Sequence, residues 1–547
     1  MLLLFFFFFF VLGVPVSAQT SLKIRGVNLG GWLVLEKWIK PSLFAEWDPF
    51  DPTSPKDEWT YCERLGKSEC QKRLDEHWDT WVSVEEMNDL ADAGITHVRV
   101  PVGWWITGDV EEGEPYVSGQ WKYFARMTRW ARERGIEVWL DLHAVPGSQN
   151  GFDNSGRLGN ATWDASTRNV NRSLAAIETI VRRVDAEGLR NDVTGFGLLN
   201  EPDQHIDYWL MLDFYNKAYD TIRTVLGDGI SIYIGDMFSP QSFNWFWHAG
   251  NPIRATNVFL DSHIYACFVD DLKAMTPKQH VTQVCRFERA HINQCCWDGW
   301  PPQPTELSRF VGEWTAAYDQ TPSPELELAS PESRPLTDDR KRFLLQYVIA
   351  QMVTFEATPE ESAPYLSGAP GLDFHGWFFW NFRMEADVYR EWDYLRGVRE
   401  GWIPKLERNV DVSDQLGLTC EDLEQEAQDC TDGVVSPFPP IPGWTGVPCA
   451  ESPPRRVLAQ TILSALALFS FMALLAALLI LARANRLLQK IPVSSRRLRR
   501  AVCFCCPGDY DAIKQRAPDD ESPASSSFYG ANAQILPTTE APISAIA

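Results

Sequence analysis

Short apolar or β-branched runs alternate with helix-like stretches along most of the chain, and this alternation restricts the possible folds more than any other feature. Eight runs occur, at Ile24–Leu29, His97–Val102, Ile136–Leu142, Thr194–Leu199, Ile230–Gly235, Val258–Ile264, Arg309–Gly312 and Gly376–Trp380. Stretches with helical periodicity lie between most of them, at Ser83–Ala93, Gln120–Arg134, Ser166–Glu187, Asp207–Leu226 and Thr337–Glu356. Strand alternating with helix is typical of parallel βαβ units with right-handed crossovers. Eight units predict an α/β protein with a (β/α)8 TIM barrel rather than a doubly wound sheet.

The predicted barrel domain covers residues 19–408. Between the first two runs, Trp38–Thr80 is too long for a simple connection, and we expect a loop excursion closed by a Cys62–Cys70 disulfide. No glycine-rich phosphate-binding loop follows any run, which argues against a nucleotide-dependent enzyme.

The two ends of the chain predict its location. Residues 1–18 are rich in Leu, Phe and Val and close on Val16-Ser17-Ala18, a pattern typical of a cleaved signal peptide. Val457–Ala482 carries no charge and is long enough to cross a bilayer as a single transmembrane helix. Lys and Arg residues cluster between Arg483 and Arg500, which places the C-terminus in the cytoplasm. The sequence therefore predicts a single-pass type I plasma-membrane protein with an extracellular barrel.

Two further segments complete the predicted organisation. Residues 409–456 contain cysteines and a proline-rich stretch, and we expect them to form a semi-rigid stalk. Residues 483–547 are predicted to be a basic juxtamembrane segment followed by a disordered cytoplasmic tail.

Net charge and cysteine content constrain the partners and the compartment. The net charge of −23 argues against nucleic acid as a partner. Of the 12 cysteines, three lie just after the predicted transmembrane helix, namely Cys503, Cys505 and Cys506. They are either palmitoylation sites or ordinary reduced thiols. The others lie on the oxidising side, where disulfides form.

The pairing of those cysteines stays open in the sequence. Cys62/Cys70 and Cys420/Cys430 are close enough to close local loops, while a middle cluster holds Cys267, Cys285, Cys295 and Cys296. Asn160 and Asn171 are glycosylation acceptors if they lie on the surface.

Polar or aromatic side chains follow seven of the eight runs, at the ends that a parallel barrel gathers into one cleft. They are Asn28 with Glu36, Arg99, His143, Asn200 with Glu201, His263 with Tyr265, Glu313, and Trp380. Each alone could be an ion-pair partner, a core histidine or a packing aromatic, but packing does not account for all of them together. Glu201 and Glu313 matter most, because two carboxylates are the minimum for hydrolysing a glycosidic bond.

The ordered motifs resemble those of glycoside hydrolase family 5. The resemblance extends from about Leu22 to Leu406 and rests on Gly26–Glu36, His97–Gly103, Asp141–His143 with Gly147–Gly156, Leu199–Pro202, His263–Tyr265, Val311–Trp314 and Gly376–Trp380. Within the family these segments are similar to the fungal and oomycete exo-β-1,3-glucanases, the glucan 1,3-β-glucosidase type, here in a membrane-anchored form.

The resemblance implies a role for each matching residue. Glu201 would be the acid/base and Glu313 the nucleophile, supported by Asn200, which holds the sugar 2-hydroxyl, and by Arg99 and Tyr265, which orient the nucleophile. Substrate-binding roles are implied for Glu36, His143, His263 and Trp380, and for the aromatic pair Phe152 and Phe268 at the pocket entrance.

Elementary chemistry agrees with the two central roles. Arg99 beside Glu313 would favour the ionised form and lower the pKa of that carboxyl. Glu201 has to begin protonated; once the glycosyl-enzyme forms, the negative charge on Glu313 disappears and Glu201 can act as a base.

Three features depart from the family pattern, namely Ala144 after the Asp-Leu-His motif, Cys267 beside Phe268, and Trp380-Asn381-Phe382. None removes a catalytic group, but they bear on exo versus endo action and on β-1,3 preference.

We therefore expect a monomeric retaining hydrolase that releases glucose from the non-reducing ends of β-1,3-glucan in wall remodelling, with no metal and no cofactor. Alternatives are a β-glucan transglycosylase or an endo-β-glucanase on the same scaffold, and a catalytically silent surface receptor for glycans.

Overall fold

The computed structural model describes residues 23–239, 257–288, 308–323, 326, 336–357 and 374–426. The predicted signal peptide, the transmembrane span Val457–Ala482 and the cytoplasmic tail lie outside these residues. Within them, no helix combines the length and the apolar character that crossing a membrane requires.

Eight parallel strands close into one barrel in the order β1 to β8, with β1 paired to β8. Their bounds are β1 Ile24–Asn28, β2 His97–Gly103, β3 Glu137–Ala144, β4 Val193–Gly197, β5 Ser231–Gly235, β6 Val258–Ile264, β7 Ser308–Trp314 and β8 Phe374–Phe379. Each strand overlaps one of the eight predicted runs, so the prediction of a (β/α)8 barrel is confirmed.

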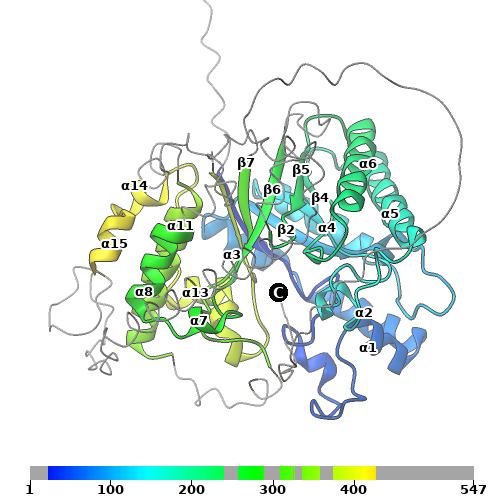
Figure 1. Ribbon diagram of the computed structural model, residues 1–547, viewed down its shortest axis with the longest axis horizontal. Coiled ribbons are helices and arrows are strands. Elements are labelled where there is room, and N and C mark those ends of the chain that lie inside the picture. Colours follow the sequence, from blue (N-terminus) through cyan, green and yellow to red (C-terminus); the bar gives the residue numbers. More distant parts are fainter. Residues whose placement is uncertain are drawn as a thin grey trace, which may run out of the picture. The chain divides into compact units, whose positions relative to one another are not determined.

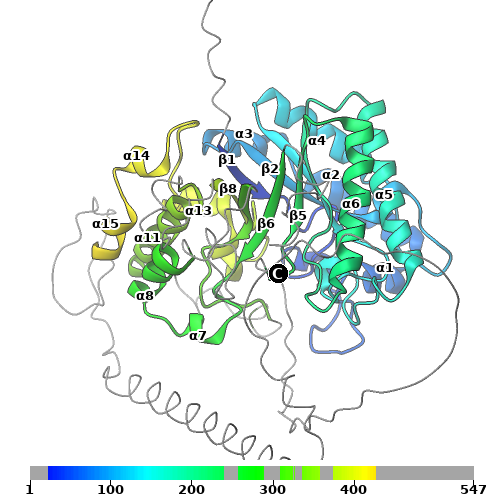
Figure 2. The same ribbon diagram turned by 45° about the horizontal axis from the view of Figure 1, so that its top comes forward.

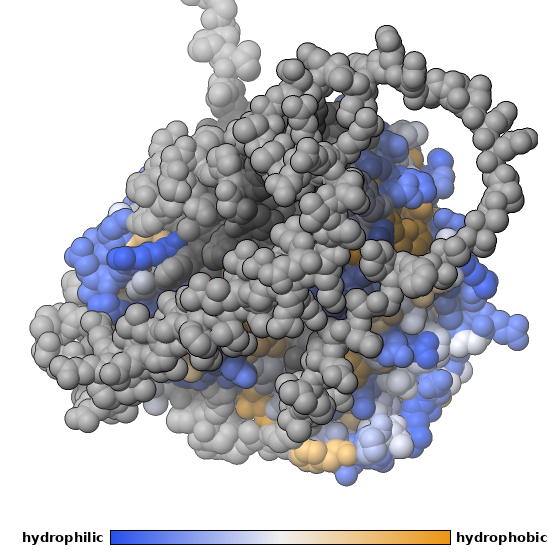
Figure 3. Space-filling model, viewed as in Figure 1, coloured by the Kyte–Doolittle hydropathy of each residue, from blue (hydrophilic) through white to orange (hydrophobic). Residues whose placement is uncertain are grey.

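Helices surround the strands, with α5 and α6 on one side of the barrel and α8 and α11 on the other (Figures 1 and 2). The described helices are α1 Glu58–Leu65, α2 Lys67–Thr80, α3 Val84–Asp92, α4 Trp121–Glu133, α5 Thr167–Ala186, α6 Tyr208–Leu226, α7 Asp270–Lys273, α8 Pro277–Thr282, α11 Asp338–Phe355, α13 Tyr394–Glu400, α14 Val412–Leu416 and α15 Cys420–Glu426. All five predicted helices are present as α3, α4, α5, α6 and α11. The described surface seen in Figure 3 is mainly hydrophilic with small apolar areas, as the high negative charge suggests.

The connection between β1 and β2 is more ordered than expected. The predicted loop excursion Trp38–Thr80 contains α1 and α2, although its Cys62–Cys70 disulfide is present as predicted. Asp57 caps α1 by accepting a hydrogen bond from the Thr60 N–H at 2.7 Å. Along α2, Cys70, Leu74, His77 and Trp78 are buried, an i, i+4, i+7, i+8 pattern that the analysis of the sequence missed.

The C-terminal end of the domain also differs from the expectation. A disulfide joins Cys285 to Cys420, so the suggested local pairing of Cys420 with Cys430 is wrong. The disulfide fixes α15 beside the segment Gln283–Glu288, and an ion pair between Arg286 and Glu424 joins the same two elements. Folded structure therefore continues past the expected boundary at residue 408, into the first part of the predicted stalk.

Aromatic rings fill the barrel interior beneath its C-terminal end. Trp139, Tyr233, Phe259, Phe310 and Phe378 form one buried cluster together with Ile24. Gly195 on β4 leaves space for this cluster, because a Cβ there would lie 2.4 Å from the Trp139 ring. Because this aromatic cluster fills the interior, the barrel is a packed core, and the polar groups lie at its C-terminal end.

Candidate active site

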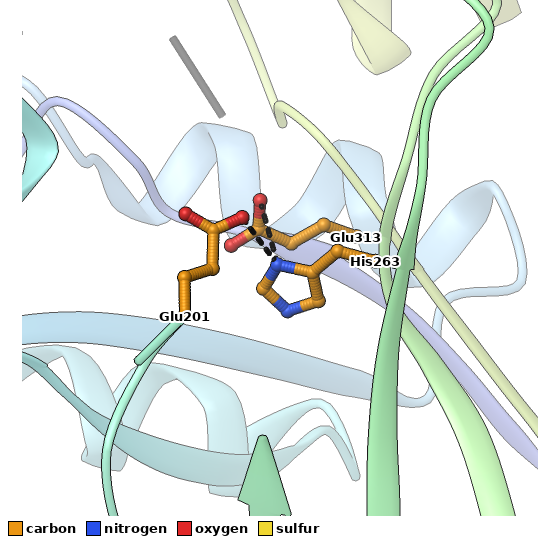
Figure 4. Close-up of side chains that lie close together, drawn as sticks. All are labelled: Glu201, His263 and Glu313. Atoms are coloured by element: carbon orange, nitrogen blue, oxygen red, sulfur yellow. Dashed lines mark hydrogen bonds and ion pairs between the residues drawn. The ribbon is translucent and has the colours of Figure 1, made fainter. Parts of the chain in front are cut away.

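Glu201 and Glu313 meet at the C-terminal end of the barrel (Figure 4). Glu313 is the next-to-last residue of β7, and Glu201 follows the end of β4 by four residues. Nδ1 of His263 lies between them, 2.7 Å from Oε1 of Glu201 and 3.5 Å from Oε2 of Glu313. One oxygen of each carboxylate and this nitrogen all lie within 4.8 Å of one another.

The backbone at Glu201 is strained. Its φ of 40° lies in the left-handed region, which residues other than glycine rarely adopt. Gly235 at the end of β5 leaves room for this turn, since a Cβ there would lie 3.1 Å from the Leu199 carbonyl and from Pro202. The side chain is held from a second side by Asn154, whose Nδ2 donates to Oε2 at 3.1 Å.

Glu313 is completely buried and has two strong donors. Arg99 donates to its Oε1 at 2.8 Å, and the Tyr265 hydroxyl donates to its Oε2 at 2.8 Å. Burial nevertheless raises the pKa of Glu313 and the charge of Glu201 adds to this, against the opposing effects of His263 and Arg99. The expected lowering of this pKa by Arg99 is thus outweighed, because desolvation is the larger effect.

Arg99 connects several polar groups beneath the two glutamates. It donates to Oδ1 of Asn28 at 2.8 Å and to Oδ1 of Asn200 at 2.6 Å, and it lies 3.1 Å from Asp141. The side chain is fully buried and comes from the middle of β2 rather than from the strand end that the sequence suggested. It therefore fixes Glu313 and Asn200 from inside the barrel.

His143 and Trp380 line the side of the site formed by β3 and β8. Nδ1 of His143 lies 2.7 Å from Asp141, and Nε2 lies 3.4 Å from the amide nitrogen of Asn200. The Trp380 ring is nearly parallel to the His143 ring, with centroids 5.7 Å apart. Trp380, for which the resemblance implies a substrate-binding role, is fully buried here.

Glu36 lies in the connection after β1. Its carboxylate accepts hydrogen bonds from the Gly31 N–H at 3.1 Å and from Trp38 Nε1 at 3.3 Å. Burial raises the pKa of Glu36 well above its ordinary value, and the nearby charge of Asp153 acts in the same direction.

The expected entrance aromatics Phe152 and Phe268 are both half-buried. Phe268 packs edge-on against Tyr265, with ring centroids 5.5 Å apart, and against Trp392 at 6.2 Å. Phe152 directly precedes Asp153 and Asn154, so it shares a loop with the group that holds Glu201.

Comparison with known proteins supports the identity that this geometry suggests. Residues 65–302 match the family model described as Cellulase (glycosyl hydrolase family 5). The chain is 34% identical over 443 residues to a glucan 1,3-beta-glucosidase of Blumeria graminis, covering 75% of this chain and 94% of the relative. It is 32% identical over 419 residues to a glucan 1,3-beta-glucosidase of Pichia angusta, covering 73% of this chain and 89% of the relative.

The chain belongs to glycosyl hydrolase family 5. This family 5 chain is therefore a glycoside hydrolase. Among solved structures, the rutinosidase from Aspergillus niger matches it with a TM-score of 0.52 at 18% identity, over 70% of this chain and 98% of that chain. At that identity the match supports the barrel fold alone.

The family 5 site contains three polar residues that the sequence analysis did not assign to it. Asn154 holds Glu201, Asp141 bonds both Arg99 and His143, and Asp261 lies 3.4 Å from Nε2 of His263. Asp141 and Asp261 each precede a site histidine by two residues, which places them on the same strand face. That spacing is the signal that could have found them.

Two other predictions concern the surface and bound groups. Asn160 and Asn171 are both exposed, which glycosylation of this family 5 chain would require. The expectations of no metal and no cofactor stay predictions.

Proposed function

We propose that this family 5 enzyme is a retaining β-glucosidase that acts on β-1,3-glucan. The main observation that supports this proposal is the short separation between Glu201 and Glu313, whose nearest oxygens lie within 4.8 Å of each other. Retaining enzymes hold their two carboxyl groups about 5–5.5 Å apart, whereas inverting enzymes leave about 6.5–9.5 Å for a water molecule. The names of relatives aligned over most of their length support β-1,3-glucan as the substrate class.

In the first half-reaction, Glu313 attacks the anomeric carbon while Glu201 gives its proton to the departing glycosidic oxygen. Arg99 and Tyr265 each donate a hydrogen bond to Glu313, so they hold the nucleophile in a fixed position. The bond from the sugar to the leaving oxygen breaks as the bond to Glu313 forms.

In the second half-reaction, Glu201 removes a proton from a water molecule, which attacks the anomeric carbon and releases Glu313. Two inversions at one carbon give net retention of configuration. The contacts of Asn154 and His263 with Glu201 keep its carboxyl group at the same place in both half-reactions.

We also propose that the site takes a chain end and releases single glucose units. Support comes from the excursion between β1 and β2, which packs against Glu36. The Leu35 N–H donates to Oε2 of Glu58 at 2.8 Å, and the backbone of Glu36 forms an isolated antiparallel β-bridge with the backbone of Asp57. Ordered structure behind Glu36 would close one end of the substrate site.

Product analysis with laminari-oligosaccharides tests this proposal. Glucose should be the first product, with each substrate shortened by one unit at a time. An early ladder of long fragments would show endo action instead, and products longer than the substrate would show transglycosylation. Absence of any hydrolysis would favour a glycan-binding receptor.

We further propose that the enzyme acts at the plasma membrane with its barrel outside, where it remodels wall glucan. The support is the uncharged run Val457–Ala482 with basic residues after it. Protease added to intact cells should remove the barrel and leave a C-terminal epitope protected. Loss of the epitope with survival of the barrel would reverse the orientation.

A further inference from the structure

His263 contacts carboxylates at both ring nitrogens. On one side, Nδ1 lies 2.7 Å from Glu201 and 3.5 Å from Glu313. On the other side, Nε2 lies 3.4 Å from Oδ2 of Asp261, a residue of β6 to which the mechanism above gives no role. While Glu201 is ionised, as it is once it has given its proton to the leaving group, a ring that faces carboxylate oxygens at both nitrogens satisfies them only when each nitrogen carries a hydrogen, which makes it an imidazolium.

Asp261 is placed specifically for this contact. It is 3% exposed, and its backbone carbonyl accepts from the Asp236 N–H at 3.1 Å. The neighbouring strand makes room for its carboxylate at Gly312, where a Cβ would lie 2.0 Å from Oδ1 of Asp261. The glycine that directly precedes Glu313 therefore allows a carboxylate to fit behind His263.

The charges around His263 come from several strands. Besides Glu201, Glu313 and Asp261, the charges of Asp236 after β5 and Asp141 on β3 interact with His263, and Arg99 on β2 contacts Glu313 and Asp141. Burial opposes the charged ring, but the carboxylates of Glu313 and Asp261 outweigh burial and raise the pKa of His263 well above its ordinary value.

We propose that Asp261 is a positioning residue: it fixes the orientation of His263 and keeps the ring doubly protonated, so that Nδ1–H points at Glu201 and Glu313. Without this carboxylate the ring can lose its Nε2 proton or rotate, and the acid/base loses a fixed donor. The inference rests on the roles proposed for Glu201 and Glu313, and it adds a residue that acts on the reaction only through His263.

The test compares Asp261→Asn with the wild-type full-length protein on an aryl β-glucoside across pH. Asparagine keeps the shape and removes the charge. We expect kcat to fall about 10- to 100-fold, which is the loss seen in metalloenzymes when a carboxylate that orients a metal-binding histidine is removed. KM should change little. The alkaline limb of the kcat/KM profile should move to lower pH, because loss of the Asp261 charge lowers the pKa of His263.

Asp236→Asn is the matched control, because it removes a nearby buried carboxylate that accepts from the Phe238 N–H and does not bond the imidazole. The alkaline limb of its kcat/KM profile should move less than that of Asp261→Asn. Equal shifts in the two variants would indicate a general field effect and overturn the proposal, as would a loss of kcat with no shift in Asp261→Asn.

A double-mutant cycle separates action through His263 from a purely structural role. In a His263→Asn background, adding Asp261→Asn should lower kcat less than about twofold. If the two substitutions instead lower kcat independently, so that their fold-losses multiply, the proposal is contradicted.

Unfolding temperatures check that each variant is folded. If Asp261→Asn does not fold, Asp261→Ser replaces it, because serine is smaller and fits beside Gly312. Wild-type protein that hydrolyses no β-glucoside would defeat the proposed function, whereas an active wild type with an unshifted variant would overturn this inference alone.

Discussion

A carboxylate oxygen of Glu201 and one of Glu313 lie within 4.8 Å of each other at the open end of the barrel, although the two residues belong to different strand units. Glu313 is fully buried inside β7 and held by Arg99 and Tyr265. Glu201 sits on a strained turn after β4. The different surroundings of the two residues suit different tasks: Glu313 is a nucleophile held in a fixed position, and Glu201 is the group that gives and takes a proton.

Replacing Glu201 by alanine should slow glucan hydrolysis about 10²–10⁴-fold, because a general acid contributes about that much. A dinitrophenyl β-glucoside should be hydrolysed with a smaller defect in the first half-reaction, since its leaving group needs no proton. Added azide should restore turnover of that substrate and yield a β-glucosyl azide. An α-glucosyl azide would argue against a covalent intermediate on Glu313.

Replacing Arg99 by methionine should lower kcat at least about 100-fold, as expected for the loss of a preorganised donor. It should also lower the free energy of unfolding by about 3–5 kcal/mol, because Asp141 and Glu313 would remain buried without their cation. Arg126→Met, which removes a partly exposed ion pair with Asp79, is the control and should cost no more than about 1 kcal/mol. Similar stability losses in the two variants would contradict this reading of Arg99.

Stability should depend on pH through Glu58, whose burial raises its pKa to about 8. The native state keeps this proton up to that pH, whereas the unfolded chain loses it near the ordinary value of 4.5. Stability therefore falls as pH rises through this window, by about 1.4 kcal/mol per pH unit from this group.

The variant Glu58→Gln has no proton to lose and can keep the acceptor for the Leu35 N–H. Its unfolding temperature should exceed that of the wild type at pH 8 and approach it at pH 5. The exposed Glu63 on the same helix provides the control, and Glu63→Gln should leave both values unchanged. A constant difference between Glu58→Gln and wild type across this range would refute the assignment.

The two disulfides should contribute unequally to stability. Cys285–Cys420 closes a separation of 135 residues and Cys62–Cys70 one of 8 residues. The loop-entropy relation gives about 5 kcal/mol for the first and about 2.5 kcal/mol for the second. Denaturant unfolding of the paired Cys→Ser variants measures both values, and an equal or reversed order would contradict the prediction.

The fold was predictable because each strand of a parallel barrel is buried on both faces and reads as an apolar run. Polar residues at the ends of such runs also predicted that Glu201 and Glu313 would meet. The resemblance supplied their individual roles, which the residues alone do not distinguish.

Other features depend on contacts that the sequence does not show. Cys285 and Cys420 meet because α15 folds back onto a segment far away in the chain. Arg99 comes from the middle of its strand, and its effect on Glu313 depends on a competition with burial. The role of Asp261 depends on the space left by Gly312 on the neighbouring strand.

The anomeric configuration of the first glucose released from a laminari-oligosaccharide tests the central claim most directly. Proton NMR in the first minutes distinguishes the two anomers before they equilibrate, and Glu313→Gln serves as the inactive control. The spacing of Glu201 and Glu313 predicts that β-glucose appears first and α-glucose follows only by mutarotation. Initial release of α-glucose would mean inversion, and Glu313 would then not be the nucleophile.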